Sequence, residues 1–277
     1  MNGLIELFQY NFFLNAVAAA LLAGISCGIA GTYIVSRRKV FISGGITHAS
    51  FGGIGLAYFL GLPPLLGAAF FAVFAAFGIQ FLSHKAEIRE DSSIAIWWSL
   101  GMALGIIFIY MTPGYVPNLM SYLFGSILTV SAPELWLMLA LTIVLAGFFI
   151  LFFRPILYIS FDENFARTTG IPVNLFNYLL LALVALTIVL NIRVVGIILI
   201  LSLLTIPQAT ANLFTRSFKK MIFMSTAIAF LGAFSGLMFS YFADIPSGAA
   251  IIFTLVIVFG IVKLLKTFCK WQKTRKN

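Results

Sequence analysis

Residues 37–64 read RRKVFISGGITHASFGGIGLAYFLGLPP. Three basic residues precede a long run without Asp, Glu, Lys or Arg, and two prolines interrupt that run. A helix of about 20 apolar residues is long enough to cross the hydrocarbon core of a bilayer, and Pro64 does not fit inside a regular helix. The stretch therefore predicts a membrane-spanning helix over 41–60, followed by a tight turn.

The composition of the whole chain points the same way. Of the 277 residues, 62% are hydrophobic and 9% are charged, whereas soluble proteins have about 25% charged residues. The net charge of +9 comes from basic residues that lie between apolar runs, which is typical of membrane topology and not of a nucleic-acid partner. We expect an all-α polytopic membrane protein, a single domain over 1–277 surrounded by the lipid bilayer.

Runs without charged residues predict about nine spans, and eight remain possible because Asn191–Val194 separates two of them only weakly. The spans are expected near 12–35, 41–60, 65–83, 92–111, 135–153, 173–191, 194–213, 221–242 and 247–265. Segment 118–130 is too short for a further crossing and is expected to be re-entrant or to lie at the surface.

The basic residues between the spans predict the orientation of the chain. They cluster at 37–39, 85–89, 154–167, 216–220 and 263–276, which are alternate ends of the expected spans. Because loops rich in Lys and Arg stay in the cytoplasm, the N-terminus is expected outside and the C-terminus inside. Arg193 is the exception.

The span over 41–60 carries the most informative polar residue. Gly44, His48, Gly52 and Gly55 share one helical face, where small residues allow a neighbouring helix to approach closely. An ionisable residue at membrane depth is a candidate for an ion path, and imidazole binds transition-metal ions. The alternative is a neutral His48 that donates one hydrogen bond and joins two helices.

Three further residues are candidates for the same path. Thr205 and Gln208 flank Pro207, and a helix broken by proline can line a transport cavity; a simple kink is the alternative. Asp244 precedes the last span at the expected outer face, where an acid attracts cations, although it could equally cap the next helix.

Enzymatic function is not expected. The sequence contains neither the nucleotide-binding pattern Gly-x-x-x-x-Gly-Lys-Ser/Thr nor a His-Glu-x-x-His zinc motif. We therefore expect no catalytic residues, no tightly bound cofactor and an energy source on another chain.

The one long polar insert, 154–172, is expected to be a cytoplasmic coupling loop. Asp162 or Ser160 can cap a short helix that ends near Thr169, with Gly170 as its stop. Apolar side chains on such a helix need a partner, which suggests docking onto a soluble subunit; the alternative is a helix that lies on the lipid surface, which the acidic pair at 162–163 disfavours near anionic lipid. The residues assigned to this coupling role are Phe161, Asp162, Glu163, Phe165, Ala166 and Gly170.

Five ordered motifs resemble one family. They are Phe41-x-x-Gly-x-x-x-His-Ala-Ser-Phe-x-Gly53, Tyr122-Leu-Phe-Gly-Ser-Ile-Leu128, Ser160-Phe-Asp-Glu-x-Phe-Ala-Arg-x-x-Gly-Ile171, Val195-Gly-Ile-x-Leu-x-x-x-Leu-Leu-x-Ile-Pro-x-Ala-Thr-Ala211 and Asp244-x-Pro-Ser-Gly-Ala249. Together they resemble the ABC-3 family, the permeases of manganese, zinc and iron ABC importers. That family usually has an acid shortly before the histidine, in the context Gly-Asp-x-x-x-His; this chain has Gly45 in that stretch and no acid.

The resemblance implies the ABC importer permease fold and a set of partners. These are a second copy of the chain, an ABC ATPase subunit docked on the 160–171 loop, and an extracytoplasmic metal-binding protein. The implied substrate is a divalent manganese, zinc or iron ion, and the implied location is the cytoplasmic (inner) membrane of a prokaryote.

Two other transport functions stay open at this point. One is a permease for a metal chelate such as haem, cobalamin or a siderophore, although such permeases resemble longer chains. The other is an ion-coupled secondary transporter, which would need several membrane-buried acids. None of the eight acidic residues falls inside an expected span.

Overall fold

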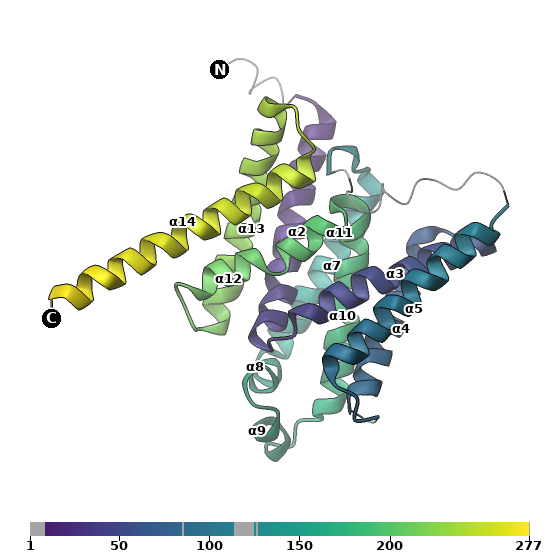
Figure 1. Cartoon of the computed structure of the whole chain (residues 1–277), viewed down its shortest axis with the longest axis horizontal. Helices are drawn as coiled ribbons and strands as arrows, with labels where there is room; N and C mark the ends of the chain where they lie inside the picture. Colours follow the sequence, from purple (N-terminus) through teal and green to yellow (C-terminus); the bar gives the residue numbers. More distant parts are fainter. Residues whose placement is uncertain (1–8, 85, 114–124, 126, 277) are drawn as a thin grey trace.

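The computed structural model describes residues 9–84, 86–113, 125 and 127–276. Every regular element in these ranges is helical (Figure 1). Eight helices are long and apolar enough to cross a membrane. They are α2 (Asn11–Ser36), α3 (Val40–Leu60), α4 (Pro64–His84), α5 (Glu90–Met111), α7 (Ala132–Leu151), α10 (Val173–Val195), α13 (Phe218–Ala243) and α14 (Ser247–Lys276).

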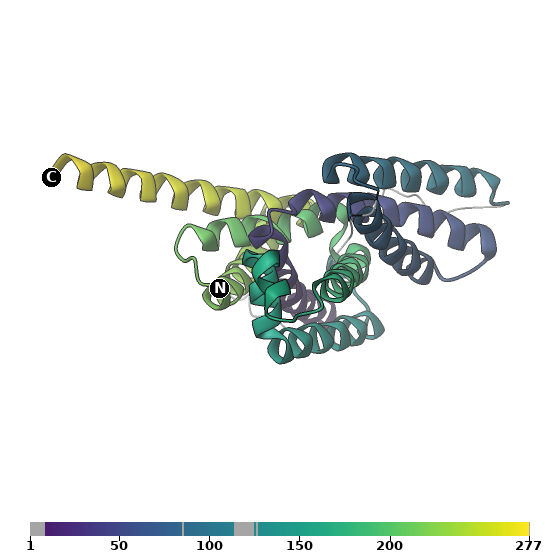
Figure 2. The same ribbon diagram turned by 90° about the horizontal axis from the view of Figure 1, so that it is seen from below.

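The long helices form two groups. Helix α2 runs through one group and packs against α7 and α13, while α3 packs against α4 and α5 in the other group, and α10 joins the two through α4. Figure 2 shows α5 and α7 on opposite sides of the molecule. The α3–α5 group is thus a distinct part of the fold, reached by the chain directly after α2.

The helix bounds agree closely with the predicted spans except in one place. The expected span 194–213 is not a single helix but two short ones, α11 (Ile197–Leu203) and α12 (Ile206–Asn212). Gly196 separates α10 from α11 with φ of 83°, a backbone conformation that residues with a side chain rarely adopt. Pro207 lies in the first turn of α12, where its missing N–H costs no helical hydrogen bond.

The polar insert contains two helices. The predicted short helix is confirmed as α9 (Glu163–Thr168), while α8 (Phe153–Phe161) directly before it was not expected. Of segment 118–130, residues 118–124 and 126 lie outside the described residues. Ile127–Thr129 form the 3₁₀ turn η1.

Candidate metal path and coupling loop

The α3 helix meets α5 through backbone contacts at two of the three predicted packing glycines. A Cβ atom on Gly55 would lie 2.5 Å from the carbonyl oxygen of Gly105, and one on Gly52 would lie 3.0 Å from that of Gly101. Gly44 differs, because the nearest atom to its added Cβ would be 3.8 Å away, on the Trp98 ring. The two helices therefore touch through their backbones beyond His48, whereas at Gly44 there is room for a side chain.

His48 lies between these two zones. Its imidazole stacks on the indole of Trp98 from α5, with ring centroids 4.1 Å apart and an interplanar angle of 6°. The side chain is half-buried, and its Nδ1 atom is buried without a hydrogen-bond partner. The Nδ1 atom of His48 is thus not used in a hydrogen bond within the protein.

Among the described residues, no group of three or more His, Cys, Asp or Glu side chains converges as a ready metal site. His48 is therefore not part of a preformed cluster of three or more such side chains in the described part of the chain. A complete tetrahedral set, of the kind that holds structural zinc, would need groups from elsewhere.

The amide of Gln208 is committed to helix packing. Gln208 is fully buried, and its Nε2 atom donates to the carbonyl oxygens of Cys27, 2.8 Å away, and Leu203, 3.1 Å away. A Cβ on Gly31 would clash with this amide. Its Oε1 atom is buried without a partner, so Gln208 keeps one acceptor unused.

Thr205 is also bound locally, because its hydroxyl donates to the carbonyl oxygen of Leu201, 2.8 Å away. Gln208 contacts α2 and Thr205 contacts α11, whereas the imidazole of His48 stacks on α5. No hydrogen bond joins His48 to either of these two predicted path residues.

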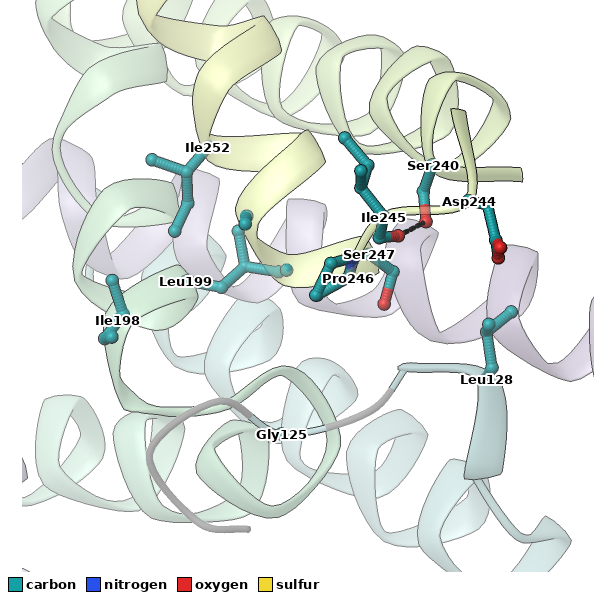
Figure 3. A pocket seen from close by; sticks show the side chains of 12 residues that line it. Gly125, Leu128, Ile198, Leu199, Ser240, Asp244, Ile245, Pro246, Ser247 and Ile252 are labelled. Carbon is teal, nitrogen blue, oxygen red and sulfur yellow. Dashed lines mark hydrogen bonds between the residues drawn. The ribbon is translucent and has the colours of Figure 1, made fainter. Parts of the chain in front are cut away.

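Asp244 lies at the turn between α13 and α14, at the end of the molecule opposite α9 (Figure 1). It ends α13 with φ of 53°. Together with Leu128 and Ser247 it lines an open pocket of about 450 Å³ (Figure 3). The Ser240 hydroxyl closes the turn by donating to the carbonyl oxygen of Ile245, 2.6 Å away.

The same end holds an ion pair that accounts for the exceptional position of Arg193. Its Nε atom lies 2.6 Å from a carboxylate oxygen of Glu134. Glu134 also accepts a hydrogen bond from the backbone N–H of Ser131, 2.8 Å away, which forms a capping box at the start of α7. Arg193 therefore contributes a paired charge at this end.

The coupling loop has the predicted cap and apolar residues. Asp162 accepts hydrogen bonds from the backbone N–H groups of Asn164 and Phe165, at 2.9 and 3.0 Å. Phe161 and Phe165 are 64% and 49% exposed, and Ala166 is fully buried. Gly170 follows the helix with φ of 79°. Two aromatic rings are thus presented outward at one end of the molecule.

Glu163 has a role that the sequence did not reveal. Its carboxylate pairs with Arg37 at the end of α2 and accepts a hydrogen bond from Asn177 of α10, 3.0 Å away. Burial alone would raise the pKa of Glu163, but hydrogen bonds from Arg37 and Asn177, with the nearby charges of Arg37 and Lys39, hold that pKa below its ordinary value. Because Arg37 is 126 residues away, no local pattern could have indicated this anchor.

The fold and these features define a class: a polytopic helical membrane subunit with a broken helix inside it and a short amphipathic helix at one end. Residues 9–266 match the model of the ABC 3 transport family. The chain belongs to that family.

The chain is similar to individual relatives along nearly its full length. The chain is 40% identical over 261 residues to the membrane protein slr2045 of Synechocystis, covering 94% of this chain and 93% of the relative. It is 35% identical over 256 residues to the manganese transport system membrane protein MntC of Halalkalibacterium halodurans, covering 92% and 88%. The structure is similar to PsaBC from Streptococcus pneumoniae in complex with Fab, with a TM-score of 0.83, 33% identity, and coverage of 94% and 95%.

Proposed function

We propose that this chain is the membrane permease subunit of an ABC importer for divalent transition-metal ions, with manganese as the preferred substrate. The observation that carries the proposal is the near full-length similarity to permeases named for manganese transport, both the MntC relatives and ScaB of Streptococcus parasanguinis, the latter 32% identical over 97% of this chain. The subunit itself catalyses no reaction, and ATP hydrolysis belongs to a partner chain.

His48 is proposed as a transient ligand on the path of the ion. An imidazole nitrogen binds iron and zinc readily and manganese more weakly, and a single nitrogen per chain would hold the ion only briefly. A second copy of the permease would supply a second His48. Asp244 would attract the cation at the outer pocket. Thr205 and Gln208 could ligate it only if a conformational change released their present hydrogen bonds.

The coupling loop is proposed to bind the ABC ATPase. Phe161 and Phe165 present exposed rings on α8 and α9, while the pairing of Glu163 with Arg37 and Asn177 ties α9 to α2 and α10. A movement of the ATPase that displaced α9 would therefore pull directly on two membrane helices. An extracytoplasmic metal-binding protein would deliver the ion at the opposite end.

The location proposed is the cytoplasmic membrane of a prokaryote, with the C-terminus inside. Ion pairs support a common side for three basic clusters: Lys39 lies 3.0 Å from Glu90 beside Arg89, and Arg37 pairs with Glu163 in the insert. The Nζ atom of Lys266 lies 5.2 Å from the ring centre of Phe214, which brings the C-terminal cluster near the one at 216–220.

Uptake of radioactive manganese by proteoliposomes that contain the permease, its ATPase and its extracytoplasmic protein tests the function. We expect ATP-dependent uptake that unlabelled manganese abolishes and magnesium does not. ATP-dependent uptake of haem, cobalamin or a ferric siderophore, with no manganese uptake, would establish the chelate alternative instead. Uptake driven by a proton or sodium gradient without ATP would establish a secondary transporter.

Cysteine labelling tests the orientation. The exposed Cys269 is first replaced by Ser, and Asp244→Cys and Ser217→Cys are then made separately, at opposite ends of α13. We expect an impermeant thiol reagent added to intact cells to label the cysteine at 244 and not the one at 217. The reverse pattern would invert the orientation.

A further inference from the structure

The histidine proposed as a ligand lacks the support that metal-binding histidines usually have. Such a histidine binds the metal through one ring nitrogen and donates the N–H of the other to a carboxylate or carbonyl oxygen, which fixes the orientation of the ring. In His48, Nδ1 is buried and has no hydrogen-bond partner. A different contact must therefore hold the ring.

The contact that the structure shows is the Trp98 indole. The two rings lie almost parallel, with an interplanar angle of 6° and centroids 4.1 Å apart. The indole also lies over Gly44, one helical turn earlier, where an added Cβ would be 3.8 Å from the Trp98 ring. The ring of Trp98 therefore spans the turn of α3 that leads to His48.

The backbone keeps Trp98 in this place. A Cβ atom on Gly101, one turn further along α5, would lie 2.5 Å from the Cα atom of Ala49, the residue after His48. Because α3 and α5 touch there through their main chains, Trp98 has little freedom to move away from the imidazole without separating the helices.

We infer that Trp98 is a positioning residue of the metal path: its indole holds the His48 imidazole in one orientation, with Nδ1 turned into the protein and Nε2 offered to the divalent cation. This inference rests on the proposed function. Trp98 is 38% exposed, and the face of an indole ring attracts cations.

The neighbouring Trp97 provides a matched control. It has the same side chain and lies on the same helix, but it packs against α4: its ring meets Phe74 edge to face with centroids 5.1 Å apart, and it covers Gly78. Trp97 thus joins α5 to α4, and no ring contact links it to His48.

The first measurement is manganese binding to the permease–ATPase complex without the extracytoplasmic protein, by equilibrium dialysis with radioactive manganese. In Trp98→Leu we expect the half-saturating concentration to rise about fivefold, the size expected when one stacked aromatic pair is lost, with the amount of folded complex unchanged. Trp98→Phe should recover part of the affinity. Trp97→Phe should leave the half-saturating concentration unchanged.

The second measurement is fluorescence of a variant in which Trp97, Trp136 and Trp271 are all replaced by Phe. Manganese should quench the emission of Trp98, magnesium should not, and His48→Ala in the same background should remove the quenching. Because Trp98 itself is kept in this variant, the measurement does not depend on whether a protein with Trp98 replaced can fold.

The outcomes separate the inference from the function on which it rests. If His48→Ala leaves manganese binding and uptake unchanged, the ligand role of His48 is wrong. If His48→Ala loses binding while Trp98→Leu keeps the wild-type half-saturating concentration, or if manganese does not quench Trp98, the positioning role is wrong and the proposed function stands.

Discussion

His48 on α3 and Gln208 on α12 look alike in the sequence, because each is a polar residue in an apolar run and each is a candidate for the metal path. The structure treats them differently. Gln208 is fully buried, and its amide nitrogen is shared between two carbonyl oxygens from α2 and α11. His48 is half-buried and has no hydrogen bond at Nδ1. A polar residue in a span is therefore available to a substrate only to the extent that its hydrogen-bonding groups are not already used in helix packing.

The largest expected effect separates the two residues by phenotype. His48→Ala should reduce manganese uptake to background while the amount of folded permease stays normal, because the small side chain fits beside Gly44 without strain. Gln208→Ala should lower the amount of folded permease while uptake per folded molecule is retained. Uptake assays normalised to size-exclusion profiles measure both. Loss of uptake by well-folded Gln208→Ala would return Gln208 to the path.

Gly31→Ala tests whether the Gln208 side chain is held tightly between α12 and α2. The added Cβ would clash with the Gln208 amide and would lie 2.6 Å from the carbonyl oxygen of Leu204, so α12 must move away from α2. We expect a loss of about 2 kcal/mol in the free energy of unfolding, measured as a lowered thermal midpoint in detergent. An unchanged midpoint would mean that α12 is loosely held and free to rearrange.

Glu163→Gln extends the comparison of His48 and Gln208 to a charged side chain, whose carboxylate is bound by Arg37 and Asn177. Since the folded-state pKa of Glu163 lies below its ordinary value, its stabilising effect is fully present above the unfolded pKa, about 4.3, and is lost as the pH falls through the folded pKa. The free energy of unfolding of the variant should be about 1–2 kcal/mol lower than that of the wild type at pH 7. Thermal midpoints of the two proteins should converge as the pH falls through the folded-state pKa of Glu163. A difference that persists in acid would contradict the ion-pair account.

Gly44→Ala should give the smallest effect, and with the opposite sign. The added methyl group has ordinary contact distances to Trp98 and Leu201, 3.8 and 4.0 Å, and Ala favours a helix over Gly by about 0.5–1 kcal/mol. We expect a slight rise of the thermal midpoint with normal uptake. The matched Gly55→Ala, which meets the Gly105 backbone, should lower the midpoint.

Most of the fold could be predicted from the sequence, because apolar runs of the right length and their Pro or basic boundaries are local signals. The expected span 194–213 differs: it contains no charged residue, so hydropathy predicts one crossing, whereas the break at Gly196 depends on a backbone angle that hydropathy does not report. Asp162 as the cap of α9 was predictable from residue type and spacing.

Less of the candidate site than of the fold could be predicted from the sequence. His48 could be found as an ionisable residue in a glycine-rich span, but its partner Trp98 is 50 positions away and looks like any other apolar residue of α5. Arg37 and Glu163 each had a local interpretation, one as a topology signal and one as a docking residue. Their pairing is a tertiary contact, so neither interpretation revealed the anchor of α9.

The break before α11 also constrains the rest of the chain. A side chain on Gly125 would collide with the backbone of Gly196, and both residues have positive φ, 58° and 83°. A side chain at position 125 would require the two backbones to separate, and a side chain at position 196 would be strained by the positive φ. In a related sequence, the loss of either glycine would signal a different path of the main chain at the mouth of the Asp244 pocket, even where every membrane span is preserved.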